Sequence, residues 1–256
     1  KVLKNNKGAG IAGGQTELES NVKPPKWFEK NKELYSIGKI AERSEDITNR
    51  ELHLWNSGIV IRKNALNDVL KLNENLSRQN NSELNYELPY DPELESGIKL
   101  SGWKILYEQR LVLKHFVSVR KFNWDYIRKI NRLKGIAEVK QSFYSRFIFE
   151  NAIDTGIRSR IRDAGLTLSK INKYPVKKIF SEERELYGDT DVLEIERLKG
   201  NLKEILSSKD SYVKTALEYI TRLNGNGYNN SNGKYIRDTD KLKAGVSIII
   251  CCYNSA

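Results

Sequence analysis

The chain has 256 residues, of which 39% are hydrophobic and 30% are charged, so it can fold as one large or two small domains. No apolar stretch approaches the roughly 20 residues that a membrane span requires, which argues against an integral membrane protein. The net charge of +11 favours anionic partners such as a lipid surface or phosphorylated substrates. We find no zinc-finger spacing or aromatic-basic RNA motif, and therefore do not expect a nucleic-acid binder.

The first hundred residues predict alternating strands and helices. Residues 10–14 read as a strand, and residues 53–62 read as a loop that runs into an apolar strand. Residues 63–72 place apolar side chains at helical spacing, whereas residues 73–90 are polar and Asn-rich, as in a mobile loop. Residues 91–101 predict a helix with Asp91 as its cap, and Gly102 ends it.

The rest of the chain changes from strands to helices. Residues 103–107 and 111–116 predict two short strands, and residues 124–223 predict a helical tract. Its most amphipathic segment, residues 192–206, places Leu198, Leu202, Ile205 and Leu206 on one face. Residues 224–234 are rich in Asn and Gly and predict a flexible linker.

The chain ends on a pattern that is typical of the start of a domain. Residues 246–250 form an apolar, β-branched run, which predicts a strand buried on both faces of an α/β sheet. The partners of such a strand would have to follow it. Because the chain also begins with Lys1 and contains no Met, we expect an internal piece of a longer protein, cut inside two domains. Alternatively, this strand fills a vacant edge of the first sheet.

The cysteine content indicates the compartment. Cys251 and Cys252 are adjacent and have no other cysteine to pair with, which favours a reducing, cytoplasmic environment.

Three stretches, in order, resemble the family 2 glycosyltransferases of the GT-A fold, and a fourth resembles a segment that opens the fold in that family but stands last here. The first is Ala-Gly-Gly at 12–14 with Lys-Trp-Phe at 26–28, and the second is Leu-Trp-Asn-Ser-Gly-Ile-Val-Ile-Arg-Lys at 54–63. The third combines Asp-Pro-Glu-Leu-Glu at 91–95, Gly-Trp-Lys at 102–104, a His-containing strand at 111–116 and Asn-Trp-Asp-Tyr at 123–126. The last, at 246–254, is similar to the family's opening strand.

The resemblance implies a fold class and a division of the chain. Residues 1–135 are expected to be the C-terminal half of a GT-A (Rossmann-like α/β) domain, residues 136–244 a helical region with a linker, and residues 245–256 the first strand of a second GT-A domain. The family's activity would be inverting transfer of a sugar from a nucleotide-sugar donor to a glycan or lipid-linked acceptor. The intact protein would use Mg²⁺ or Mn²⁺, and the part present here would be inactive alone. A location at the cytoplasmic face of the membrane is compatible with this activity.

The resemblance also assigns roles to individual residues. Asp91 matches the catalytic aspartate, which would take the proton from the acceptor hydroxyl, although it also reads as a plain helix cap. His115 matches a histidine that helps to bind the metal or the diphosphate; the alternative is a local hydrogen bond. Trp55 and Gly58 match the acceptor-facing segment, with Trp55 otherwise a core aromatic. Tyr253 and Asn254 would lie near the nucleobase of the second domain's donor.

Some positions depart from the family's pattern or have simpler readings. Tyr90 and Pro89 stand where the family has Glu and Gly, and Asn56 replaces a Gly. These changes leave open a non-catalytic module that binds a partner or an anionic surface. His53 has no counterpart and reads as a loop residue.

Three further features are interpreted as structural. The Asp-x-Asp strings at 189–191 and 238–240 follow no apolar strand, so we interpret the first as a helix cap and the second as part of a linker. Trp124 and Tyr126 predict core packing, with a membrane-surface contact beside Lys121 and Arg128 as the alternative.

Overall fold

The computed structural model describes residues 2–72, 92–145, 157–180, 186–207 and 247–250. The chain divides into two units. The first comprises Lys1–Asn21, Asn31–Ser118 and Thr221–Ala256, and the second comprises Val22–Lys30 and Val119–Ile220. The predicted boundaries at 135 and 244 stay a prediction.

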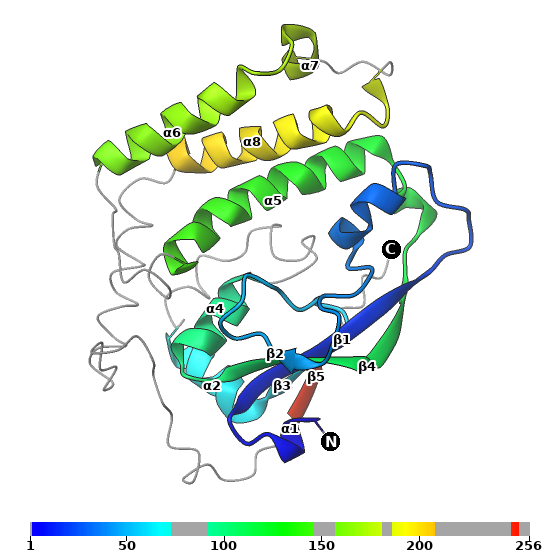
Figure 1. Ribbon diagram of the computed structural model, residues 1–256, viewed down its shortest axis with the longest axis vertical. Coiled ribbons are helices and arrows are strands. Elements are labelled where there is room, and N and C mark those ends of the chain that lie inside the picture. The colour runs from blue at the N-terminus through cyan, green and yellow to red at the C-terminus, as the bar shows by residue number, and fades with distance from the viewer. Residues whose placement is uncertain (1, 73–91, 146–156, 181–185, 208–246, 251–256) are drawn as a thin grey trace. The chain divides into compact units, whose positions relative to one another are not determined.

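A mixed sheet organises the first unit (Figure 1). Its strand order is β2-β4-β1-β3-β5. Strands β1 and β4 are parallel, while the β1–β3, β2–β4 and β3–β5 pairs are antiparallel. The bounds are Ala9–Glu19 for β1, Glu45–Asp46 for β2, Ile59–Arg62 for β3, Lys104–Phe116 for β4 and Ser247–Ile250 for β5. The prediction of an α/β chain is therefore confirmed at the level of mixed α/β structure.

The strand predicted at 246–250 is confirmed as β5. It pairs with β3, with Ile59 opposite Ile250 and Ile61 opposite Ile248. The strand thus joins the edge of the first sheet, which is the alternative given in the sequence analysis. Its assignment to a second domain stays a prediction.

The helices at 63–72 and 92–100 follow predicted segments, whereas the short helices at 2–5 and 29–35 were not predicted. Helix α1 spans Val2–Asn5, α2 spans Lys63–Leu72 and α4 spans Pro92–Leu100, with the 3-10 helix η1 at Glu29–Tyr35. Gly102 has a φ of 75°, which L side chains rarely adopt. The amide of Gly102 donates to the Lys99 carbonyl and that of Trp103 to the Ile98 carbonyl, so these two carbonyls in the last turn of α4 are satisfied. Gly102 therefore ends α4 as predicted.

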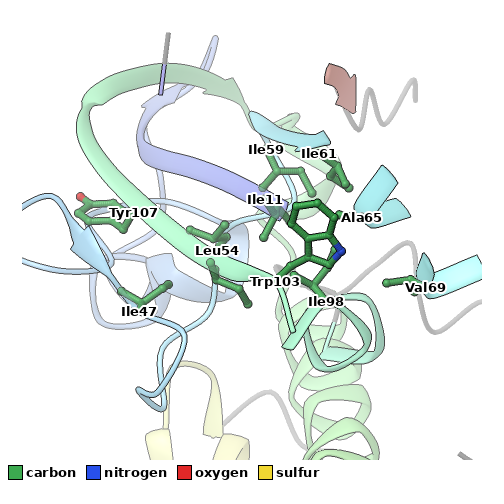
Figure 2. Packing of buried hydrophobic residues seen from close by; sticks show 11 residues of the cluster. Ile11, Ile47, Leu54, Ile59, Ile61, Ala65, Val69, Ile98, Trp103 and Tyr107 are labelled. Carbon is green, nitrogen blue, oxygen red and sulfur yellow. The ribbon is translucent and has the colours of Figure 1, made fainter. Parts of the chain in front are cut away.

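Trp103 lies at the centre of the core of the first unit. Figure 2 shows its ring among Ile11 of β1, Ile61 of β3 and Ala65 of α2. Its indole nitrogen donates to Asp68 Oδ2 at 2.9 Å, so the buried polar atom has a partner. The core thus joins helices α2 and α4 to the sheet.

The prediction of two strands at 103–107 and 111–116 was wrong, because β4 is one strand that contains a bulge. Gly13 pairs with Tyr107 and Gln15 with Val112, so Gly14 alone faces residues 108–111. A side chain at position 14 would clash with the Leu111 carbonyl, and glycine therefore permits the bulge. Within it, the Glu108 carboxylate accepts hydrogen bonds from Arg110 and from Ser44 Oγ, which lower its pKa to about 2.

Arg62, at the end of β3, anchors the N-terminal segment of the chain. Its guanidinium donates to the carbonyls of Leu3, Asn6 and Ala9 at 2.5, 3.1 and 2.9 Å. Burial lowers the pKa of this arginine. One side chain thereby binds three carbonyls between residues 3 and 9 and ties this segment to the end of β3.

The second unit contains only helices among its described residues: η2 at Val119–Lys121, α5 at Trp124–Ser145, α6 at Ile157–Ile171, α7 at Val176–Phe180 and α8 at Thr190–Ser207. Helices α5, α6 and α7 all contact α8. Gly135 of α5 faces the carbonyl of Arg197, and Gly200 of α8 faces the carbonyl of Arg132. A side chain at either glycine would clash with the opposite backbone, so these two glycines set the close approach of α5 and α8.

Glu196 is the buried charge of the helix pair. It is 1% exposed and forms ion pairs with Arg128 at 3.0 Å and with Arg132. Burial opposes ionisation, but the hydrogen bonds from Arg132 and Arg128 hold the pKa of Glu196 below its usual value. Glu196 of α8 thereby links two arginines of α5 to this helix.

The prediction of an apolar face on α8 is correct only in part. Leu198 is buried, whereas Leu206 is 63% exposed, close to the end of the helix at Ser207. The buried side is instead completed by Glu196 and by Gly200, which meet α5. Periodicity alone does not include a charged residue in a buried stripe.

Trp124 packs in the interior of the second unit. Its ring centroid lies 5.8 Å from that of Trp27 and 5.4 Å from that of Tyr187. The core-packing interpretation of Trp124 is therefore confirmed. Tyr126 is half-buried, with the Lys121 ammonium 5.8 Å from its ring centroid.

Candidate functional site

The loop before β3, residues 52–58, is attached to helix α4 by one carboxylate. Glu95 is 3% exposed; its Oε1 accepts the amide of Leu54 at 2.6 Å and its Oε2 lies 2.7 Å from His53 Nδ1. The same carboxylate therefore accepts a hydrogen bond from the loop backbone and orients the His53 imidazole. Burial lowers the pKa of Lys99, one turn further along α4, and the negative charge of Glu95 opposes this shift.

The other end of the same loop is attached to β4. Ser57 Oγ lies 2.8 Å from His115 Nδ1. Gly58 has a φ of 77°, and a Cβ there would lie 3.1 Å from Leu113. Glycine thus permits both the turn and the approach to β4. Loop 52–58 consequently joins α4 to the end of β4.

Trp55 lies between these two attachments and faces inward. Its side chain is 8% exposed, and its indole N–H donates to the Gly38 carbonyl at 2.9 Å. This geometry gives Trp55 a packing role in the loop. Its predicted contact with an acceptor stays a prediction.

The remaining predicted site residues lie outside the described residues. Asp91 precedes Pro92, the first residue of α4, while Tyr253 and Asn254 follow β5. The Asp-x-Asp string at 238–240 and the mobile loop predicted at 73–90 also fall outside. The structure therefore brings the second stretch, at 54–63, together with two parts of the third, helix α4 and the His115 strand.

The described residues do not fit a metal centre. Nowhere in the described ranges do three His, Cys, Asp or Glu side chains gather as a ligand set. His115 instead interacts with the hydroxyl of Ser57. The predicted role of His115 in binding Mg²⁺ or Mn²⁺ would require ligands from elsewhere in the protein.

The Asp-x-Asp string at 189–191 is a helix cap, as predicted. Asp189 Oδ1 accepts the amide of Asp191 at 2.8 Å at the start of α8. Both carboxylates also pair with Lys178, at 2.8 and 2.6 Å. Burial opposes ionisation of Asp189, but the hydrogen bond from Lys178 lowers its pKa. Both carboxylates of the string therefore have a structural role, in the helix cap or in the pairing with Lys178.

Sequence reasoning missed the contacts of Glu95, His53 and Ser57. Glu95 stands within the quoted motif, but periodicity gives no sign that it is buried. His53 was correctly predicted to be in a loop, yet its partner lies 42 residues away. The only available signal was the spacing of Glu95 and Lys99, which puts opposite charges one turn apart on a helix.

Comparison with protein families, with curated proteins and with solved structures finds no significant match to the chain. No helix within the described ranges combines the length and apolarity that a membrane crossing needs.

Proposed function

We propose that the chain supplies the acceptor side of an inverting glycosyltransferase similar to family 2 of the GT-A fold. One observation carries the proposal: loop 52–58 is bonded to Glu95 of α4 and to His115 of β4. The second stretch and two parts of the third, which lie up to about sixty residues apart in sequence, are thus joined by these contacts. The mixed sheet beneath them supports an α/β domain of this kind.

The proposed reaction needs a base for the acceptor hydroxyl. Asp91 is the residue proposed for this role, because it precedes the first turn of α4. Glu95, one turn into α4, holds the neighbouring loop in place. The donor would be a nucleotide sugar, the acceptor a glycan or a lipid-linked sugar, and the compartment the cytoplasm. A divalent cation, and the nucleotide contacts proposed for Tyr253 and Asn254, belong to the donor side of the longer protein.

The test is product analysis with the natural full-length protein. A panel of uridine- and guanosine-diphosphate sugars would be incubated with Mg²⁺ or Mn²⁺ and with a mixture of glycan and lipid-linked acceptors. The proposal predicts acceptor-dependent release of nucleoside diphosphate and a product whose anomeric configuration is opposite to that of the donor. Retention of configuration, or transfer that does not require an acceptor sugar, would contradict it.

A non-catalytic module is the second candidate, and the replacements at Pro89 and Tyr90 favour it. In this case α4 and loop 52–58 would keep their packing without any sugar transfer. The two candidates differ in how they respond to substitution of Asp91. A cap residue contributes roughly 1 kcal/mol to stability, whereas a general base contributes about a hundredfold or more to rate.

A further inference from the structure

The outward side of α6 combines exposed apolar side chains with positive charge. Helix α6 packs on α8, and Ala164, Thr167 and Ile171 are buried along one side of it. On other sides Ile161 is 66% exposed and Leu168 is 45% exposed. These two residues are seven positions apart, so they lie on the same face of α6, two turns from each other. Figure 1 shows α6 running beside α8.

The same segment of the chain is rich in positive charge. Between Ile157 and Phe180 the sequence contains Asp163 as its one carboxylate and seven cations: Arg158, Arg160, Arg162, Lys170, Lys173, Lys177 and Lys178. Three of the seven have partners within the unit: Arg160 donates to the Ile205 carbonyl, Lys178 pairs with Asp189 and Asp191, and Arg162 pairs with Asp163 at 3.4 Å while remaining exposed. Arg162 and others point outward, and together with the apolar residues they form what we call the α6 surface: Arg158, Ile161, Arg162, Leu166, Leu168, Lys170 and Lys173.

We propose that the α6 surface docks on an anionic phospholipid bilayer. The cations are complementary to acidic headgroups, and Ile161 and Leu168 would enter the boundary between headgroups and acyl chains. A nucleic acid or other soluble polyanion would satisfy the cations but would leave these apolar side chains in water. The exposed apolar residues are therefore what favours a lipid surface. This inference is independent of the proposed sugar transfer.

The α6 surface is a better candidate for a membrane contact than the Trp124 region considered in the sequence analysis. There the aromatic ring is buried against Trp27 and Tyr187, and Arg128 is paired with Glu196. On α6 the apolar side chains reach solvent. The short helix α7 also exposes apolar side chains, with Val176 71% and Phe180 79% exposed.

The test is co-sedimentation of the full chain with vesicles of phosphatidylcholine alone or mixed with phosphatidylglycerol. We expect binding to the mixed vesicles only, and weaker binding at high salt. The double variant Arg158→Gln, Arg162→Gln should bind roughly twentyfold more weakly, since each cation near an anionic surface is worth about fivefold. The double variant Ile161→Asn, Leu168→Asn should lose about tenfold or more.

Matched controls lie on α8. Leu206→Asn removes an apolar side chain that is 63% exposed, and Lys203→Gln removes an exposed cation; both should bind as the wild type does. Circular dichroism would verify that every variant is folded. Equal binding to both kinds of vesicle, or to neither, would overturn the proposal. So would binding that survives the Ile161 and Leu168 substitutions and is competed by DNA, which would indicate a polyanion site.

Discussion

Glu95 Oε2 lies 2.7 Å from His53 Nδ1, while the other oxygen of the same carboxylate accepts the amide of Leu54. One buried side chain thus joins helix α4 to the loop that continues into β3. Ser57 of that loop in turn contacts His115 of β4. A continuous series of contacts therefore runs from Glu95 of α4 through loop 52–58 to the end of β4. The geometry of the candidate site depends on this connection.

Replacing Glu95 tests how much the connection stabilises the first unit. Glu95→Ala leaves the buried Leu54 amide without the acceptor that Glu95 gives it, so we expect the free energy of unfolding to fall by about 2–3 kcal/mol. Glu95→Gln keeps an acceptor oxygen and should cost less. Urea denaturation measures both, with Glu51→Ala, at an exposed position before the loop, as the control. If Glu95→Ala is as stable as the wild type, the carboxylate does not hold the loop.

The crossing of α5 and α8 predicts contrasting effects of glycine substitutions. Gly135→Ala and Gly200→Ala each place a methyl group against the backbone carbonyl of the other helix, so we expect a loss of about 3 kcal/mol or more. Gly165→Ala in α6 meets no atom within 4 Å and should stabilise the protein by roughly 0.5–1 kcal/mol. Thermal unfolding of the three variants separates these outcomes. A neutral effect at both Gly135 and Gly200 would mean that α5 and α8 lie further apart.

Glu108 predicts a contribution to acid sensitivity. Its pKa is about 2 in the folded chain, compared with 4.5 as its ordinary value, because Arg110 and Ser44 donate to its charged form. The folded state therefore binds this proton less readily than the unfolded state does. The resulting stabilisation is fully present above pH 4.5 and is lost as the pH falls towards 2.

The Glu108→Gln variant isolates this contribution. We expect the difference in unfolding free energy between wild type and variant to be largest above pH 4.5 and to shrink as the pH falls towards 2. Denaturation midpoints measured across this range provide the check. Arg110→Gln should raise the pKa of Glu108 towards its ordinary value, as read from its carboxyl resonance. A difference that does not vary with pH would show that the charge of Glu108 is not stabilised by folding.

Local patterns predicted the elements whose signals lie within a few residues. The spacing of Ala65 and Val69 gave α2 at 63–72, and Gly102 marked the end of α4 because its positive φ is intrinsic to the turn. The apolar run at 246–250 likewise identified β5. In each case the determining residues are neighbours in the sequence.

Features that depend on distant neighbours were missed. The bulge in β4 exists because Gly14 faces Leu111, almost a hundred residues away, so residues 108–111 looked like a break between two strands. The contact between His53 and Glu95 and the two glycines of the α5–α8 crossing are likewise properties of packing. For the candidate site, the sequence identified His115 and the 54–58 segment but not the carboxylate that connects the segment to α4.

We propose above that the chain carries the acceptor side of a sugar transferase with Asp91 as its base. The most direct measurement is the turnover of Asp91→Asn against the wild type, in the natural full-length protein with a nucleotide-sugar donor and acceptor. We predict a fall of about a hundredfold or more, with stability lowered by no more than roughly 1 kcal/mol. Unchanged turnover, or no turnover by the wild type with any donor, would contradict it.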